Sequence, residues 1–214
     1  AQTESRFRGI GRYTMSLTQA IVRNKGEHEV IIALNGLFPD TIEPIRASFE
    51  GLLSQENILV WHAPGPVREE QSGNDSRRET AELIREAFMA SLQPDVILVS
   101  SLFEGYVDDA VTSIGRFDTS TPVIVIFYDL IPLLYQDHYF KFNLRYKQYY
   151  LRKVEHLRRA AKCLAISDFS CEEGLEVLGK AGDRIVSIST AVDPHFQPKT
   201  IDEAAAYRLR QKFG

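Results

Sequence analysis

The feature that most constrains this chain is a set of six short apolar runs with helical patterns between them. The runs are continuous rather than alternating, which is typical of parallel strands buried on both faces of a sheet. Because most of them are separated by apolar residues at helical spacing, the sequence predicts an α/β fold with a doubly wound parallel sheet. The predicted strands are Glu29–Leu34, Ile58–Trp61, Val96–Val99, Val123–Phe127, Cys163–Ile166 and Ile185–Ile188.

Several segments between and after these strands carry helix signals. Ser76 and Glu79 have the spacing of a capping box, and Asp108 is placed to cap a short helix. Ser167 or Asp168 starts a helix that is expected to end at Gly179. Two further helices are expected on the apolar stripe from Tyr146 to Ala161 and over Ile201–Phe213.

A glycine loop opens the first helix of the chain. Gly9 and Gly11 let the backbone approach a ligand, and the free N–H groups of a first helical turn point at that ligand. Arg8 and Arg12 add charge of the sign that an anion would bind. The loop predicts a site for a phosphate or a sugar, and tight packing of the backbone is the alternative.

Such a loop usually follows a buried strand, yet no apolar run precedes Gly9. We therefore expect a first strand of the sheet upstream of Ala1, because a sheet without it would leave strand edges unpaired. The last predicted helix runs to Phe213 with no strand after it, so we expect the protein to continue beyond Gly214 as well.

Polar residues follow the predicted strands at the sheet edge where ligands of open parallel sheets bind. Asp129 can position a substrate hydroxyl or accept a proton, or it can cap the next turn. Tyr128 can donate to a sugar or phosphate oxygen, or it can complete the strand. Glu104 is a candidate for binding an acceptor hydroxyl, with turn formation as the alternative. Ser167 is a candidate for phosphate binding, although a helix cap is favoured.

Composition and spacing exclude several classes of function. The net charge of −4 gives no general attraction to nucleic acid, so any phosphate binding must be local. The five histidines show no metal-ligand spacing, and the sequence contains no Walker loop or serine elbow. The two cysteines suggest no disulfide framework, which favours the cytoplasm. We therefore expect no metal, no nucleic acid and a cytoplasmic protein.

The segment Phe140–Lys162 is strongly basic, with eight Lys or Arg residues against the single acid Glu155. Arg145, Arg152 and Arg159 recur every seven residues and so share one helix face. A solvated helix flank is the favoured interpretation. Peripheral contact with an anionic membrane surface is the alternative.

Taken together, these motifs resemble the N-terminal domain of family 4 glycosyltransferases, which have the GT-B fold of two facing Rossmann-like domains. The first two motifs are most similar to those of bacterial mannosyltransferases that build O-antigen and other polysaccharides. The resemblance covers nearly the whole chain. It rests on Arg8–Tyr13 (RGIGRY), Phe127–Leu133 (FYDLIPL), Ala165–Ser170 (AISDFS) and Val186–Pro194 (VSISTAVDP).

The resemblance implies a retaining transfer of a mannose-like hexose from a nucleotide sugar, with GDP-mannose as the candidate donor, to a glycan or a lipid-linked acceptor. It implies no cofactor. Residues 1–200 would form the acceptor-side domain, and residues 201–214 would begin a linker helix toward a C-terminal donor domain, without which the chain is not expected to be active. Asp129 and Glu104 would orient sugar hydroxyls, and the amides of Gly9–Arg12 would face the leaving diphosphate.

The sequence departs from the family pattern at two points. Tyr128 stands where the family has a histidine before Asp129, and Thr190 and Ala191 replace an Asn-Gly pair. Two other functions stay open. One is a nucleotide or sugar-phosphate binding module without catalysis. The other is an NAD-dependent epimerase or oxidoreductase, which would require a third glycine where Thr14 stands and an acid near Asn35.

Overall fold

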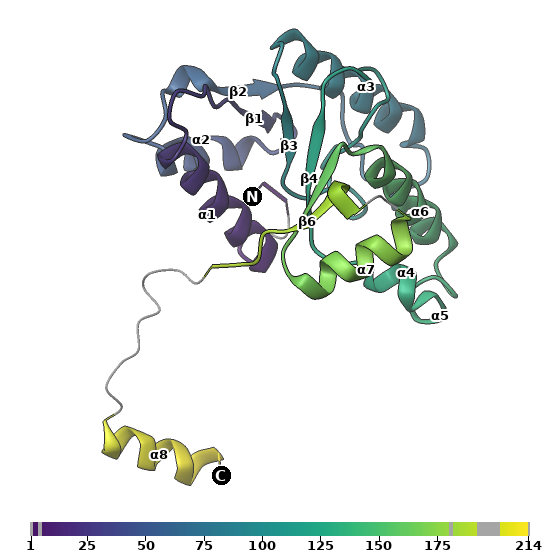
Figure 1. Ribbon diagram of the computed structural model, residues 1–214. Helices are drawn as coiled ribbons and strands as arrows, with labels where there is room; N and C mark the ends of the chain where they lie inside the picture. The colour runs from purple at the N-terminus through teal and green to yellow at the C-terminus, as the bar shows by residue number, and fades with distance from the viewer. Residues whose placement is uncertain (1, 4–5, 180–181, 192–201, 214) are drawn as a thin grey trace.

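The structure is a computed structural model that describes residues 2–3, 6–179, 182–191 and 202–213. Parallel strands alternate with helices in it, as Figure 1 shows. The strands are β1 (Ile32–Asn35), β2 (Ile58–Trp61), β3 (Ile97–Val99), β4 (Val123–Phe127), β5 (Lys162–Ala165) and β6 (Ile185–Ser187). The helices are α1 (Gly9–Arg23), α2 (Pro39–Ser48), α3 (Asp75–Ser91), α4 (Ile131–Leu134), α5 (Gln136–Tyr139), α6 (Leu144–Arg159), α7 (Asp168–Leu178) and α8 (Glu203–Phe213), with 3-10 turns at Gln55–Asn57 and Gly182–Arg184.

All six predicted strands are present, and every pair of neighbours is parallel. β1 pairs with β2, while β3, β4, β5 and β6 form a second sheet in that order. The first strand begins at Ile32, later than the predicted Glu29. The α/β class with a parallel sheet is thus confirmed.

The order of the strands shows where the chain reverses direction. From β1 it moves outward to β2, and α3 then returns it to β3, from which β4, β5 and β6 follow outward on the other side (Figure 1). This reversal is the topological switch point of a doubly wound fold, and it lies between β1 and β3. Ligands of such folds bind outside the carboxyl ends of the strands at this point.

The main core lies where α6 and α7 pack on β4 and β5. Phe127 at the end of β4 is buried there together with Tyr149 and Leu157 of α6. Gly174 lets α7 come close, since a Cβ at this position would lie 2.9 Å from the Phe127 ring. A smaller core joins α1 and α2 to β1 and β2. These contacts fix the positions of the strands whose carboxyl ends form the candidate site.

The helices agree less completely with the sequence predictions. α7 has Ser167 as its N-cap and ends at Gly179 in the left-handed conformation, as predicted. The capping box at Ser76 is wrong, because Asn74 is the N-cap of α3. No helix starts at Asp108, whose carboxylate instead accepts a hydrogen bond from the Ala110 amide. α8 begins at Glu203, and Ile201, Asp193 and Pro194 lie outside the described residues.

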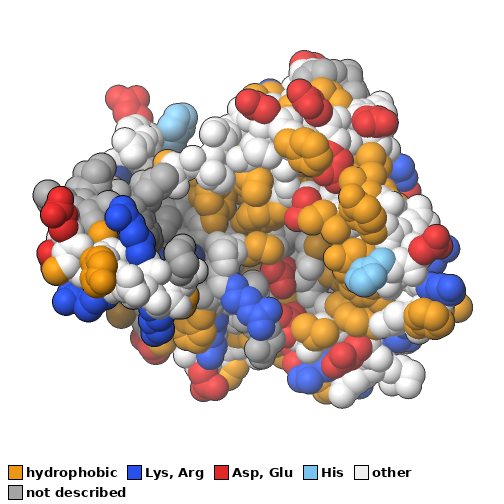
Figure 2. Space-filling model, turned by 90° about the horizontal axis from the view of Figure 1, so that it is seen from below, with side chains coloured by type: hydrophobic (Ala, Val, Ile, Leu, Met, Phe, Trp, Pro, Cys, Tyr) orange, Lys and Arg blue, Asp and Glu red, His pale blue; other side chains and the backbone are white. Residues whose placement is uncertain are grey.

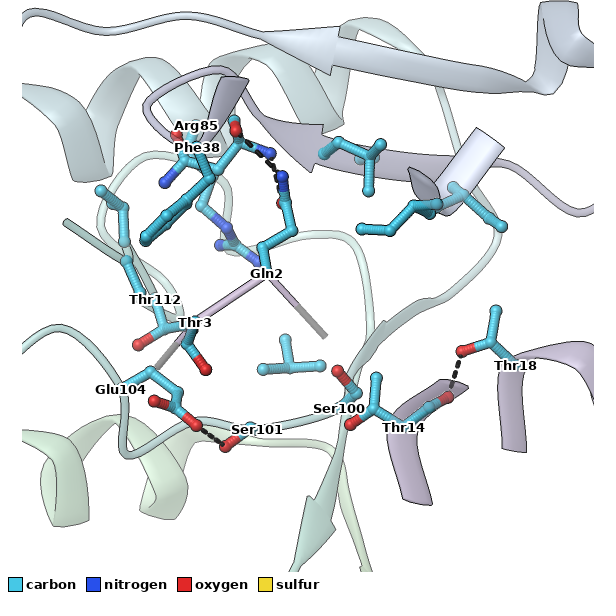
Figure 3. A pocket seen from close by; sticks show the side chains of 18 of the residues that line it. Gln2, Thr3, Thr14, Thr18, Phe38, Arg85, Ser100, Ser101, Glu104 and Thr112 are labelled. Atoms are coloured by element: carbon cyan, nitrogen blue, oxygen red, sulfur yellow. Dashed lines mark hydrogen bonds between the residues drawn. The ribbon is translucent and has the colours of Figure 1, made fainter. Parts of the chain in front are cut away.

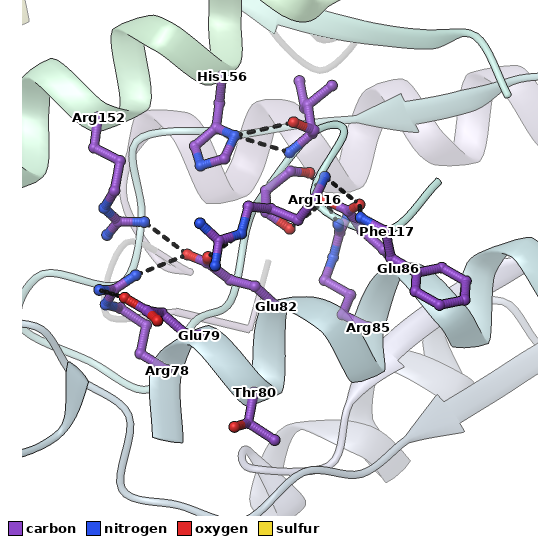
Figure 4. A network of polar contacts seen from close by, with 12 residues as sticks. Arg78, Glu79, Thr80, Glu82, Arg85, Glu86, Arg116, Phe117, Arg152 and His156 are labelled. Atoms are coloured by element: carbon purple, nitrogen blue, oxygen red, sulfur yellow. Dashed lines mark hydrogen bonds and ion pairs between the residues drawn. The ribbon is translucent and has the colours of Figure 1, made fainter. Parts of the chain in front are cut away.

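A buried polar network joins α3 to α6 (Figure 4). Glu82 of α3 is 1% exposed and accepts hydrogen bonds from Arg78 at 3.2 Å and from Arg152 at 2.7 Å. Arg145 donates to the Glu69 carbonyl and pairs with Asp75 at 2.9 Å. The basic face of α6 is therefore not a solvated flank, because its arginines bind acids and carbonyls of neighbouring segments.

His156 lies in the same region of α6 and is expected to make stability depend on pH. Burial, reinforced by the charge of Lys153, lowers the pKa of His156 from 6.5 to about 4. Its Nδ1 lies 3.1 Å from the Ile114 amide nitrogen, which donates to the neutral ring. As pH falls from about 6.5 to 4, the unfolded chain takes up a proton that the folded protein does not. We expect a loss of roughly 3 kcal/mol of unfolding free energy over this range.

Urea unfolding at pH 7.0 and pH 4.5 measures this dependence. His156→Gln should flatten the difference between the two pH values, because glutamine keeps an acceptor for the Ile114 amide but does not titrate. His62→Gln, at an exposed histidine, is the control and should leave the difference unchanged. An equal pH dependence in wild type and His156→Gln would contradict the assignment.

Candidate functional site

Tyr128 links the elements that meet at the carboxyl edge of the sheet. Its hydroxyl donates to the Ser100 carbonyl at the end of β3, at 3.2 Å. Its ring meets Tyr13 of α1 edge to face, with centroids 6.0 Å apart. Its carbonyl accepts a 2.7 Å hydrogen bond from Ser170 of α7. The edge is therefore built from the ends of β3 and β4 and the N-terminal parts of α1 and α7.

The environment of Tyr128 keeps its phenol protonated. Burial raises the pKa to about 12, and the Thr14 hydroxyl, which opposes the change, only partly offsets it. Since the group stays neutral at physiological pH, it keeps one proton to donate, and that proton would have to turn from the Ser100 carbonyl to reach a sugar or phosphate oxygen. It cannot replace the charge of a histidine at this position.

Asp129 follows Tyr128 and lines a cavity of about 160 Å³ together with Ile10, Ser101 and Tyr146. Its Oδ1 accepts a 3.1 Å hydrogen bond from the Ile131 amide. The carboxylate thus caps the turn before α4 and also faces the cavity. The position of Asp129 is therefore compatible with a role in binding substrate and with a role in capping the turn, the two interpretations that the sequence left open.

The backbone on both sides of Asp129 is held by α7. Ser170 donates to the Tyr128 carbonyl, and the buried Glu173 carboxylate accepts from the Leu130 amide at 2.8 Å. From the sequence Ser170 was a candidate helix cap only, and Glu173 was not predicted, because each acts on a residue more than forty positions away. No local pattern indicates such a contact.

Glu104 lies in a neighbouring cavity of about 210 Å³ at the switch point (Figure 3). Ser101 donates to its Oε1 at 3.0 Å. Thr3 and Thr14 line the same cavity. Ile10 and Ser101 line both this cavity and the one that contains Asp129, so the two carboxylates lie in adjoining hollows.

Ser167 acts as the helix cap that the sequence favoured. Its Oγ accepts from the Ser170 amide at 3.1 Å and lies 3.0 Å from the Ser170 hydroxyl. It reaches the Tyr128 region only through Ser170 and does not line either hollow.

The glycine loop is divided between two sides of α1. Arg8 is the extended N-cap residue, and a Cβ at Gly9 would meet no atom within 4 Å, so this end is open. Gly11 is buried, and together with Arg12 it lines a cavity of about 470 Å³ against α2. The structure therefore brings Asp129, Tyr128 and Glu104 together beside Ile10 of the loop, while Gly11 and Arg12 face a different hollow.

The face at the carboxyl edge also carries exposed apolar side chains (Figure 2). They gather on α4, α5 and the start of α6, beside Lys141 and Lys147. Their exposure ranges from 37% to 90%, and the group consists of Ile131, Leu134, Tyr135, Tyr139, Phe142 and Leu144.

The described part of the chain contains no cluster of three or more His, Cys, Asp or Glu residues placed to hold a metal ion. None of its helices has the length and apolar character needed to cross a bilayer.

Comparison with known proteins identifies the family. The model of Glycosyltransferase Family 4 matches residues 7–196, which is most of the chain. The chain belongs to glycosyltransferase family 4. The fold is accordingly that of the N-terminal domain of a family 4 enzyme, and the Rossmann-like assignment is confirmed.

Three Escherichia coli proteins, each described as serotype-specific mannosyltransferase WbdA, are similar to this family 4 chain. One is 34% identical over 213 residues, which is 99% of this chain and 25% of the relative. The others are 32% and 30% identical, each over 92% of this chain and 24% of the relative. The chain thus spans about a quarter of the length of these relatives.

Proposed function

We propose that the complete protein transfers mannose from GDP-mannose to a hydroxyl of a glycan or a lipid-linked acceptor, with retention of the anomeric configuration. The observation that carries the proposal is the pair of adjoining hollows at the carboxyl edge of the sheet, one lined by Tyr128 and Asp129 and the other by Glu104, in a family 4 chain. The WbdA relatives are described as mannosyltransferases, which supports mannose as the sugar.

In this proposal the domain contributes position and charge rather than a covalent nucleophile. Asp129 and Glu104 accept hydrogen bonds from sugar hydroxyls, and Tyr128 donates one. The open end of α1 at Arg8 and Gly9 faces the diphosphate that leaves, where helix amides and a guanidinium stabilise negative charge. A C-terminal domain would hold the nucleotide across the cleft.

The surface expected to meet a membrane or a lipid-linked acceptor is no longer the arginine face of the basic segment Phe140–Lys162. Arg145 and Arg152 of the basic segment are paired within the protein. The exposed apolar side chains of α4, α5 and the start of α6 offer a better surface, because Lys141 and Lys147 beside them can meet lipid phosphates.

The role of the α1 end can be tested in the complete enzyme with Arg8→Ala. Loss of a charge-assisted contact to the diphosphate should raise the KM for GDP-mannose by about tenfold or more. Arg23→Ala, at the other end of α1, is the matched control and should leave KM unchanged. Steady-state transfer assays with GDP-mannose measure both, and the anomeric signal of the product in NMR reports retention.

Measurements of binding, together with the transfer assays, separate the alternatives. Binding of nucleotide sugars without transfer by the complete protein would favour a binding module. Binding of NAD in place of nucleotide sugars, measured by isothermal titration, would favour an oxidoreductase or epimerase. Equal KM values for Arg8→Ala and Arg23→Ala would remove Arg8 from the donor site.

A further inference from the structure

Tyr150 of α6 is a buried tyrosine whose hydroxyl has no protein partner in the described part of the chain. The residue is 3% exposed. None of the residues that the structure describes forms a hydrogen bond with the hydroxyl. About nine in ten buried polar groups in folded proteins have a partner, because an unpaired one costs free energy. The Tyr150 hydroxyl is therefore a candidate for binding a ligand.

The Tyr150 hydroxyl reaches the cavity of about 160 Å³ that Asp129 also lines, here the Asp129 hollow. Burial, followed by the negative charge of Asp129, raises the pKa of Tyr150. A carboxylate has this effect on a phenol when the hydroxyl lies near it. The hollow thus contains a neutral donor from α6 and a charged acceptor from the end of β4.

Aromatic neighbours hold the Tyr150 ring in place. Its centroid lies 4.7 Å from that of Phe103, 5.7 Å from that of Phe140 and 6.0 Å from that of Tyr146. A ring packed in this way has little freedom to move. The hydroxyl is therefore fixed before any ligand arrives, so binding does not require it to be ordered again.

Other polar side chains of the Asp129 hollow are less suited to meet a buried ligand. Tyr128 and Ser101 donate to groups outside the hollow. Tyr146 is only half-buried, so water can reach it. Oδ1 of Asp129 accepts a hydrogen bond from the turn before α4, whereas no described residue donates to its Oδ2. The Asp129 Oδ2 and the Tyr150 hydroxyl therefore form an acceptor and donor pair for a ligand.

The shape and chemistry of the Asp129 hollow suit a sugar ring. Its remaining wall is apolar and includes Ile10, Leu102, Phe103 and Pro132. A pyranose has apolar C–H faces and a rim of hydroxyls, each of which both donates and accepts. The volume of about 160 Å³ lies below the roughly 300–1,000 Å³ of sites for drug-sized ligands. The hollow therefore suits a single ring better than a nucleotide or a lipid chain.

We propose that the Asp129 hollow binds one pyranose ring, and that the Tyr150 hydroxyl donates to a sugar hydroxyl whose own proton is accepted by Asp129. The inference rests on the proposed function, from which it takes the sugar, and it adds a specificity-determining residue on α6. A ligand without this hydroxyl would leave both protein groups unpaired, so the hollow would discriminate against it. The ring can belong to the nucleotide sugar or to the acceptor glycan.

Tyr150→Phe in the complete enzyme tests the contact, because it removes one oxygen and keeps the packing of the ring. We expect the KM for the substrate that supplies the ring to rise about three- to tenfold. A higher KM for GDP-mannose would assign the ring to the donor, and a higher KM for the glycan would assign it to the acceptor.

Tyr149→Phe is the matched control for these kinetics. The Tyr149 hydroxyl is also buried and lacks a partner among the described residues, yet Tyr149 does not line the Asp129 hollow. Both KM values should therefore match those of wild type. If Tyr150→Phe also retained the wild-type kinetic constants, the inference would be overturned and the proposed transfer would stand.

Binding of methyl α-D-mannopyranoside to the complete protein, measured by saturation-transfer NMR, tests the inference without requiring transfer. The Kd should rise about three- to tenfold in Tyr150→Phe and stay unchanged in Tyr149→Phe. Mannosides that each lack one hydroxyl locate the contact. For one of them, wild type should lose affinity by the same factor, whereas Tyr150→Phe should bind it as tightly as the parent sugar.

The binding and transfer measurements fail independently. Equal Kd values in wild type, Tyr149→Phe and Tyr150→Phe, or no binding of the mannoside to wild type, would overturn the inference. Absence of mannose transfer, with the expected pattern of Kd values intact, would overturn the proposed function and leave the sugar site in place.

Discussion

Replacing Asp129 with asparagine is expected to reduce turnover of the complete enzyme by about 10²–10³-fold. The carboxylate faces a hollow at the carboxyl edge and is the charged group nearest to Tyr128 in sequence. Asparagine keeps an oxygen that can accept the Ile131 hydrogen bond, so the turn before α4 should remain intact. The substitution therefore removes the charge and spares the cap.

Steady-state transfer assays measure kcat, and thermal unfolding of the same samples measures the melting temperature. The melting temperature of Asp129→Asn should match that of wild type, while kcat falls. Asp168→Asn, at an exposed acid in the first turn of α7, is the matched control and should keep normal turnover. Near-normal turnover of Asp129→Asn would mean that this residue serves only as a cap.

Replacing Glu86 with alanine is expected to lower the free energy of unfolding by about 3 kcal/mol or more. The buried Glu86 carboxylate holds the loop that precedes β4 (Figure 4). One oxygen accepts from the Ser113 hydroxyl at 2.6 Å. The other accepts from the amides of Arg116 at 2.7 Å and Phe117 at 2.6 Å. With alanine at this position, the Ser113 hydroxyl and the two amides would lose their hydrogen-bond acceptor.

Thermal or urea unfolding measures this effect. For a domain of this size, the loss corresponds to a fall in melting temperature of about 10 °C. Glu86→Gln keeps one acceptor oxygen and should lose less stability than Glu86→Ala. Glu79→Ala, at an exposed acid on the same helix, should change stability by no more than about 0.5 kcal/mol. Equal stability of Glu86→Ala and Glu79→Ala would show that water replaces the carboxylate.

The strands could be predicted from the sequence because a strand buried on both faces of a sheet is a continuous run of apolar residues. Runs such as Val123–Phe127 are continuous and apolar, and they were located without knowledge of their neighbours. α2 was missed because the pair Pro39-Asp40 was interpreted as a turn, although Pro39 occupies the first turn of the helix, where a proline is tolerated. The expected helix at Asp108 was wrong because its side chain bonds a local amide instead.

The residues of the candidate site could be predicted where they follow a recognisable strand, and not where their partners are distant in sequence. Tyr128 and Asp129 follow a recognisable strand, so their position at the edge could be inferred. The roles of Glu86 and Glu173 depend on contacts with distant loops, and nothing near either residue indicates them. The arginines of α6 looked like a solvated face because their acidic partners come from other segments.

The two hydrogen bonds from α7 that flank Asp129 have a consequence for the energetics of the proposed reaction. Ser170 and Glu173 belong to one helix that is packed on β4 through Gly174. The carboxylate between their two partners is thus preorganised by regular secondary structure and does not depend on a free loop. The entropy of fixing it is lost when the domain folds, so little of it needs to be lost again in each catalytic cycle.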